Sequence, residues 1–380
     1  MSSEDSEVKV TPCKVAVLGA GSYGTAMAYV ATHNGHSVCV YARDQKVVDS
    51  INKEVILTIP LRVWDMVCNL MILQHVNPKR FSDQKSTHTT QLPDSITAST
   101  DMATVLKDAA IVIHSVPAQH TPEFLAKHAN LFTKGVPLVS TAKGIHVSTH
   151  RLMSEAIPEA LGERAKEIPL LPANKILDAE RAQKVLSSMR FRVYASEDVV
   201  GVEVGGALKN PLAIGAGMAQ GLGFGQSTIA GLVTRGCREM RQLATALGGK
   251  PERFTSLPDL FGMSNRDVAV HKKSALLSLQ TLAGLSGVGD LMLTCFSSLS
   301  RNNRCGKALA KGKTIEEAFQ EIGEVVEGVP TAHEVIMLAE KLKLELPLFR
   351  AVDAIISGKL KPKEALASIM GRDLKQEKFY

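Results

Sequence analysis

The sequence predicts a two-domain protein in which an α/β domain is followed by an all-helical domain. Four short apolar runs in the first half alternate with helix-compatible stretches, a pattern typical of a parallel sheet covered by helices. These runs cover residues 15–18, 38–41, 110–116 and 136–141. From residue 198 onward, small residues and helical spacing replace this alternation. At 380 residues the chain is long enough for both domains, which we expect over residues 12–195 and 196–371.

The first apolar run ends in the glycine-rich sequence GAGSYG at residues 19–24, and a helix-forming stretch follows over residues 25–33. This is the pattern G-x-G-x-x-G, in which the three glycines permit a tight turn, close approach of a pyrophosphate and contact between helix and strand. Backbone N–H groups at the start of the helix then point at the phosphates. The motif predicts a Rossmann-type dinucleotide-binding domain. The alternative is a glycine-rich turn without a ligand.

The end of the second apolar run bears on the choice of coenzyme. It reads Tyr41-Ala42-Arg43-Asp44, without an acidic residue at the strand tip, where a ribose 2′-hydroxyl is usually held. Arg43 is therefore expected to face either the adenine or a 2′-phosphate. The alternative interpretation is that it is an ordinary exposed arginine. The coenzyme is predicted to be NAD or NADP.

Composition excludes several other classes of protein. Lysine and arginine (44) exceed aspartate and glutamate (38) by six, but the excess is scattered, and aromatic residues make up 4%. Both features disfavour nucleic acid as a partner. The most apolar stretch, residues 55–73, contains Pro60, Arg62 and Asp65, so no membrane span is expected.

The six cysteines and the N-terminus bear on location. The cysteines include no C-x-x-C pair and no histidine at metal-ligand spacing, so we expect reduced thiols and no metal site. Residues 1–12 are acidic and lack an apolar run, unlike a signal or transit peptide. We expect a cytoplasmic protein, or a plastid one if the N-terminus is incomplete.

Two lysines stand among small residues, Lys143 in STAKG and Lys209 in GGALKN. Such surroundings reduce the hydration of an ammonium group and lower its pKa toward the range useful for proton transfer, more so beside a second cation. Further on, GVGDL contains Asp290, four residues before Thr294. The segment LSRNNR contains Arg301 and would form an anion-binding loop. Arginine grips phosphate through two parallel hydrogen bonds. Taken singly, each of these features also has an ordinary structural explanation: Lys209 as a surface lysine, Asp290 as a helix cap, and the arginine segment as a solvated basic loop.

Together, the motifs GAGSYGTA, AKG, DVVGVEVGGALKN, GVGDLMLTC, LSRNN and VVEGVPTA resemble the NAD(P)-dependent glycerol-3-phosphate dehydrogenase family, in the family's order and over most of the chain. The resemblance implies a Rossmann-type domain, a helical substrate domain and usually a homodimer. It also implies reversible hydride transfer between sn-glycerol 3-phosphate, a small phosphorylated three-carbon substrate, and NAD(P). A role in supplying glycerolipid precursors and in redox balance follows from that reaction.

The resemblance carries roles to particular residues. Lys209 would take the C2 hydroxyl proton, while Lys143 would steady the oxygen and lower the pKa of Lys209. These two lysines are expected to lie close together. The implied catalytic set is Lys209, Lys143, Asp290 and Thr294. The implied substrate contacts are Lys143, Asn174, Arg301 and Asn302. The implied cofactor contacts are Gly19, Gly21, Ser22, Tyr23, Gly24, Arg43, Lys143, Arg301, Val325 and Glu327.

The sequence departs from the family in two ways. The substrate loop around Asn174 runs almost directly into residues 177–187, and the strand that should follow it is absent, which predicts an exposed sheet edge. Three stretches also interrupt family-like sequence: residues 55–74, a stretch ending at Gln91, and residues 256–280. They are either surface insertions, which loops tolerate well, or retained introns translated in frame. The intron reading arises because each stretch ends in glutamine, whose codon CAG has the same letters as the 3′ end of an intron.

Three functions are therefore compared. The leading one is the glycerol-3-phosphate dehydrogenase reaction. Dehydrogenation of another 3-hydroxy acid is disfavoured because it has no use for Arg301 as a phosphate ligand. A catalytically impaired nucleotide-binding homologue is the third, because of the shortened region at residues 172–177.

Overall fold

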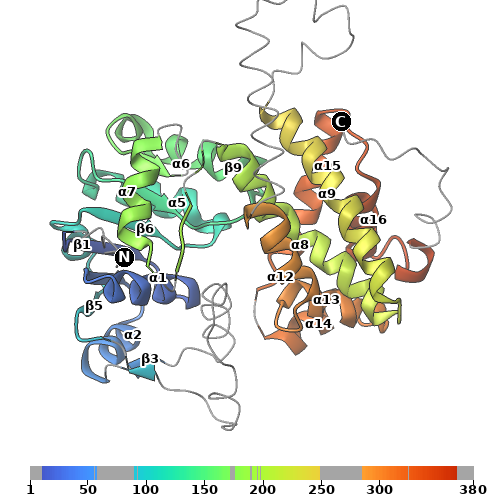
Figure 1. Cartoon of the computed structure of the whole chain (residues 1–380), viewed down its shortest axis with the longest axis horizontal. Helices are drawn as coiled ribbons and strands as arrows, with labels where there is room; N and C mark the ends of the chain where they lie inside the picture. The colour runs from blue at the N-terminus through green and yellow to red at the C-terminus, as the bar shows by residue number, and fades with distance from the viewer. Residues whose placement is uncertain are drawn as a thin grey trace, which may run out of the picture. The chain divides into compact units, whose positions relative to one another are not determined.

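The computed structural model describes residues 11–54, 56–57, 90–91, 93–171, 176–188, 191–194, 196, 198–248, 285–323 and 325–365 (Figure 1). The chain forms two compact units. Unit 1 comprises Met1–Ala142 and Ser154–Glu197, and unit 2 comprises Lys143–Met153 and Asp198–Tyr380. Each unit has its own hydrophobic core, so each is described separately.

Unit 1 is built on a six-stranded sheet in the order β10-β7-β6-β1-β2-β5, in which all neighbouring strands are parallel. The strands are β1 (Lys14–Leu18), β2 (Ser37–Tyr41), β5 (Ile96–Ser99), β6 (Ile111–His114), β7 (Leu138–Ser140) and β10 (Leu170–Leu171). Numbered by position along the chain, this is the 3-2-1-4-5-6 order of a Rossmann fold. The expected α/β domain is confirmed.

The sequence makes these strands because they are buried on both faces. Val15, Val17 and Ile113 have at most 1% exposed surface, and such strands read as continuous apolar runs rather than as alternating ones. The helices of unit 1 are α1 (Ser22–His33), α2 (Gln45–Asp49), α4 (Met102–Leu106), α5 (Thr121–His128), α6 (Met153–Leu161) and α7 (Ile176–Leu186). Residues of α1 and α7 join the strands in one core cluster.

One edge of the sheet is the two-residue strand β10, which pairs with β7. In the part of the chain that is described, no strand after residue 171 adds to this edge. A separate pair, β3 (Ile56–Leu57) and β4 (Thr90–Gln91), is antiparallel. Apart from these four residues, the three interrupting stretches lie outside the described residues, and so does Asn174.

Unit 2 is helical and is arranged around α8 (Val199–Gly221), whose residues are buried along most of its length (Figure 1). The other helices are α9 (Gln226–Gly248), α12 (Asp290–Phe296), α13 (Arg301–Ala310), α14 (Ile315–Ile322), α15 (Gly328–Lys341) and α16 (Pro347–Ile356). The expected all-helical character of this half is confirmed. It contains one small hairpin, β8 (Ile145–His146) with β9 (Arg151–Leu152).

Close contact between α8 and α13 explains the glycines at their crossing. A Cβ on Gly217 would stand 2.1 Å from the carbonyl oxygen of Asn303, and a Cβ on Gly306 would stand 2.0 Å from that of Ile214. The backbones of α8 and α13 therefore touch directly, at a separation that no larger residue permits. This close crossing fixes the start of α13 against the middle of α8.

Local signals set several helix ends. Thr314 caps α14 with a complete capping box, in which Thr314 and Glu317 satisfy each other's backbone N–H groups. The start of α16 is capped from another helix, because the buried Glu239 carboxylate of α9 accepts the N–H groups of Leu348 and Phe349 at 3.0 and 3.2 Å.

The segment Lys143–Met153 differs from the sequence-based domain boundary. The expected first domain runs unbroken over residues 12–195, but this segment belongs to unit 2. The physical reason is that Ile145 and Leu152 are buried in the core formed by α8, α9, α12 and α15. Lys143 therefore belongs to the same unit as Lys209. Among the described residues, no helix has the length and apolar content that a membrane crossing requires.

Candidate active site

The glycine turn of unit 1 connects β1 to α1. Gly19 has a φ of +114°, at which a residue with a side chain would be strained. Its N–H donates to the carbonyl of Tyr41 at the end of β2. A Cβ on Gly24 would stand 2.0 Å from the carbonyl oxygen of Gly19. The first and third glycines of the motif are therefore required by the fold itself.

The second glycine is different. Gly21 is the N-cap of α1, it makes no side-chain cap, and a Cβ placed there would meet nothing within 4 Å. No acidic residue lies in the first turn of this 12-residue helix. Open space at a helix N-terminus without nearby negative charge suits a pyrophosphate, so the turn fits a dinucleotide. Ser22 and Tyr23 begin α1 beside it.

The tip of β2 carries no unengaged carboxylate. Asp44 is the N-cap of α2, where its carboxylate accepts the N–H of Lys46 at 2.9 Å. Arg43 is exposed. Tyr41 lies behind them, with its ring 5.8 Å from that of Phe124. Asp44 therefore serves as a helix cap, and Arg43 is the exposed charged side chain next to it.

In unit 2, α8 places Lys209 inside the protein. The residue is 7% exposed, and the preceding Gly205, Gly206 and Ala207 are buried with it. Such burial of a lysine is uncommon unless its charge is paired. Here the partner is Asp290, the first residue of α12, whose Oδ1 lies 2.5 Å from the Lys209 ammonium.

The same carboxylate binds a second cation. The Lys143 ammonium lies 3.3 Å from Asp290 Oδ2, so the two lysines flank one aspartate. The Lys143 stem lies beside Gly206 on α8, where a Cβ would meet it at 3.8 Å. The sequence-based expectation that Lys143 and Lys209 lie close together therefore agrees with this geometry.

These neighbours shift both titrating groups. Burial, and then the positive charge of Lys143, lower the pKa of Lys209 from 10.5 to about 8, although Asp290 and Glu327 oppose the shift. Burial alone would raise the pKa of Asp290, but the two ammonium groups together lower it. At neutral pH the aspartate is ionised, and Lys209 holds its proton loosely enough to exchange it.

A buried amide network lies beside Lys209. Asn302 donates to Asn210 at 3.0 Å and accepts the N–H of Gly328 at 2.9 Å, which joins α13, α8 and α15. Asn210 in turn donates to Glu327 Oε2 at 3.5 Å. Sequence reasoning did not identify Asn210, although it directly follows Lys209. The structure gives the Asn302 amide a structural role, and its contact with substrate stays a prediction.

The other predicted residues are placed as follows. Thr294 lies one turn after Asp290 on α12, and its hydroxyl donates to the Asp290 carbonyl at 2.6 Å. Arg301 is the first residue of α13, after the N-cap Ser300. Val325 is 71% exposed. Thr294 is thus linked to the lysine–aspartate cluster through the Asp290 main chain.

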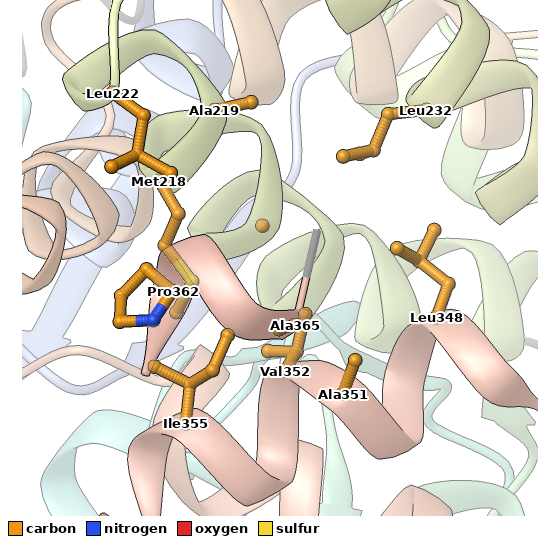
Figure 2. Close-up of a pocket in the computed structure, with 11 residues that line it drawn as sticks. Met218, Ala219, Leu222, Leu232, Leu348, Ala351, Val352, Ile355, Pro362 and Ala365 are labelled. Carbon is orange, nitrogen blue, oxygen red and sulfur yellow. The ribbon is translucent and has the colours of Figure 1, made fainter. Parts of the chain in front are cut away.

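A second hollow in unit 2 is apolar (Figure 2). Met218 of α8 and Leu222, which follows that helix, line it together with Val352 and Ile355 of α16 and with Pro362 and Ala365. None of its lining residues is titratable. It therefore offers no group for proton transfer or for binding an anion, and the candidate site remains at Lys209.

Unit 1 is a Rossmann-type sheet with a glycine turn, and unit 2 is helical and carries a buried lysine with a lowered pKa. Together these features define a dinucleotide-dependent dehydrogenase of two domains. Residues 14–172 match the family model described as NAD-dependent glycerol-3-phosphate dehydrogenase N-terminus, and residues 198–367 match the corresponding C-terminus. The chain belongs to the NAD-dependent glycerol-3-phosphate dehydrogenase family.

Individual relatives agree. The chain is 36% identical to glycerol-3-phosphate dehydrogenase (NAD+) 2, chloroplastic, of Arabidopsis thaliana, over 94% of this chain and 77% of that one. It is 34% identical to glycerol-3-phosphate dehydrogenase (NAD(P)+) of Stenotrophomonas maltophilia strain K279a, over 97% and 98%. The crystal structure of glycerol-3-phosphate dehydrogenase from Coxiella burnetii is similar with a TM-score of 0.72 and 27% identity, over 95% and 99%.

Proposed function

We propose that this chain is an NAD(P)-dependent glycerol-3-phosphate dehydrogenase, which interconverts sn-glycerol 3-phosphate and dihydroxyacetone phosphate. The observation that carries the proposal is the Lys209–Asp290–Lys143 cluster, on a chain whose sequence matches this family along both halves. Bound at the glycine turn, the coenzyme supplies a nicotinamide ring that accepts or donates hydride at carbon.

Lys209 acts as the proton-transferring group. In the oxidation direction its neutral amine takes the proton of the substrate C2 hydroxyl, as the C2 hydrogen leaves with its electron pair. In the reduction direction its ammonium returns a proton to the C2 oxygen. A pKa of about 8 serves both directions, because each protonation state is accessible near neutral pH.

Asp290 and Lys143 orient and tune that group. The aspartate holds the Lys209 ammonium at 2.5 Å and fixes its direction, while its second oxygen holds Lys143 at 3.3 Å. The Lys143 ammonium stabilises negative charge that develops on the C2 oxygen. Thr294 supports the position of Asp290 through its hydrogen bond to the Asp290 carbonyl.

The anionic ends of substrate and coenzyme have other ligands. We assign the substrate phosphate to Arg301 at the start of α13, with Asn302 beside it, and the coenzyme to the glycine turn and Arg43. Glu327 and Val325 remain proposed coenzyme contacts, and Lys143 and Arg301 are proposed to serve both ligands. Nothing in the comparisons favours the catalytically impaired alternative.

The decisive experiment measures absorbance of NADH and NADPH on addition of dihydroxyacetone phosphate. The wild-type chain should oxidise at least one of them, and Lys209→Ala should lower kcat by about 1000-fold, within the range for loss of a general acid–base group. The reduction rate should fall above pH about 8, and the oxidation rate should fall below it. Coenzyme binding without turnover by the wild type would overturn the proposal.

The assembly, location and metabolic role are finer proposals. We propose a homodimer in the cytoplasm, with a role in glycerolipid precursor supply. Family membership supports the dimer, and the chloroplast location named for the Arabidopsis relative makes the plastid the alternative compartment. Light scattering of the purified chain and fluorescence of a tagged chain in cells would test assembly and location.

A further inference from the structure

A short hairpin follows Lys143 and packs on the helices of unit 2. Its strands β8 and β9 pair antiparallel, with Ile145 opposite Leu152. These two side chains are 0% and 5% exposed, and they share a core cluster with Leu208 of α8 and Val335 of α15. The hairpin therefore has a fixed apolar base, and its loop lies beyond that base.

The loop of the hairpin contains a residue in an unusual conformation. His150 has a φ of +54°, in the left-handed region that glycine adopts without strain and that other residues adopt rarely. Its N–H donates to the carbonyl of His146 at 2.8 Å, which closes the loop. Strained backbone of this kind persists where other contacts hold it in place.

The contact that holds His150 is a hydrogen bond to a buried carboxylate. Nδ1 of His150 contacts Oε2 of Glu334 on α15. Glu334 is 1% exposed, and among the described residues no other hydrogen bond or ion pair reaches it. A carboxylate in that position needs a partner, so the pair ties the hairpin loop to α15.

Building on the proposed function, we propose that His150 and Glu334 are a positioning pair, which holds the hairpin on α15 and thereby holds the Lys143 ammonium at Asp290. Neither residue touches the reacting atoms. Both act on the reaction through Lys143.

The chain geometry makes this coupling direct. One residue, Gly144, separates Lys143 from β8, and its φ of +134° is a conformation that residues with side chains rarely adopt. The Lys143 side chain is 40% exposed and reaches Asp290 at 3.3 Å, so packing alone constrains it weakly. The hairpin is the structured element next to Lys143 in unit 2. A shift of the hairpin therefore moves the ammonium.

The consequence is measurable at Lys209. The charged groups that set the pKa of Lys209 are Lys143, Asp290 and Glu327, and of these Lys143 is the one that lowers it. If Lys143 moves away, the pKa of Lys209 rises and the charge beside the C2 oxygen is lost. Displacements of about 1 Å in such groups lower rates by up to roughly 100-fold.

The test compares His150→Gly with Glu334→Gln. Glycine adopts the left-handed conformation without strain, so His150→Gly should fold while losing the hydrogen bond to Glu334. We expect both variants to lower kcat about tenfold and to raise the pH at which the oxidation rate reaches half its maximum. The KM for coenzyme should stay unchanged. His150→Asn, which tolerates this backbone and donates a hydrogen bond, should restore most of the rate.

The matched control is His333→Gln. His333 is the neighbour of Glu334 on α15; its side chain is 62% exposed and its Nδ1 lies 3.6 Å from Asp353 Oδ1, so its loss should change neither kcat nor the pH midpoint. A purely structural role predicts a lower melting temperature for His150→Gly and Glu334→Gln, with kcat and midpoint as in the wild type. That result would overturn the proposal.

A second measurement separates this proposal from the proposed function. Nitrogen NMR titration of the lysine side chains reports the pKa of Lys209 without any turnover. If the wild type fails to oxidise coenzyme, the dehydrogenase assignment fails, yet an upward shift in His150→Gly still supports the positioning pair. If the wild type turns over and the Lys209 titration is the same in both proteins, the positioning pair fails alone.

Discussion

The glycine turn of unit 1 and the lysine cluster of unit 2 are built in opposite ways. The turn uses main-chain atoms of six consecutive residues, 19–24, and depends on the absence of side chains. The cluster uses the charged ends of two long lysine side chains, residues 143 and 209, and the carboxylate of residue 290 between them. The first should therefore be sensitive to added volume, and the second to changed charge. Substitutions can test this difference one site at a time.

The largest effect is expected at Asp290, where one carboxylate serves two ammonium groups. Asp290→Asn keeps the shape and removes the charge, so the cluster loses the attraction that raises the pKa of Lys209. The pKa of Lys209 should fall, and the buried group should lose its proton rather than unfold α8. We expect kcat for reduction at neutral pH to fall by about 100- to 1000-fold.

Coenzyme titration provides the contrast for Asp290→Asn, because its dissociation constant should match the wild type. Glu340→Gln is the matched control, since Glu340 forms an exposed ion pair with Arg350 in the same unit. A full rate in Asp290→Asn would show that the bridging carboxylate is dispensable.

The next effect tests the turn through volume alone. Gly24→Ala places a methyl group 2.0 Å from the Gly19 carbonyl oxygen, so the free energy of unfolding should fall by roughly 3 kcal/mol. Gly21→Ala meets nothing within 4 Å and should change that free energy by less than about 0.5 kcal/mol. It should nevertheless weaken coenzyme binding about tenfold, because the methyl group stands where the pyrophosphate approaches.

Thermal unfolding and coenzyme titration of the two glycine variants give the comparison. Equal stability losses at both positions would show that Gly21 is also required by the fold, and that the open space beside it has no ligand.

Sequence patterns predicted unit 1 well because its signals are local. A strand buried on both faces reads as an apolar run, and the glycine turn lies within six residues, so both are visible without knowledge of distant contacts. The helical half was equally readable from its spacing. Strands β5 and β10 were missed, because β5 has the sequence ITAS, which is not an apolar run, and β10 has only two residues.

The lysine cluster depended on the resemblance to a family. Lys143 and Lys209 are 66 positions apart, and only their small neighbours hinted at low hydration. The assignment of residues 143–153 to the helical unit required knowledge of what Ile145 and Leu152 pack against. The pairing of His150 with Glu334 joins residues 184 positions apart and leaves no pattern in the sequence.

The smallest effect is expected at Arg43, a charged side chain in the same unit as the glycine turn. The Asp44 carboxylate accepts the N–H of Lys46 as a helix cap, and the exposed Arg43 beside it is the proposed ligand of a 2′-phosphate. Arg43→Ala should weaken NADPH binding about fivefold, or about 1 kcal/mol, and leave NADH unchanged, because an exposed guanidinium gains modestly from a 2′-phosphate. Titration of each coenzyme measures the difference, with Lys53→Ala as the exposed control. Equal losses for both coenzymes would instead place the Arg43 guanidinium against the adenine, which they share.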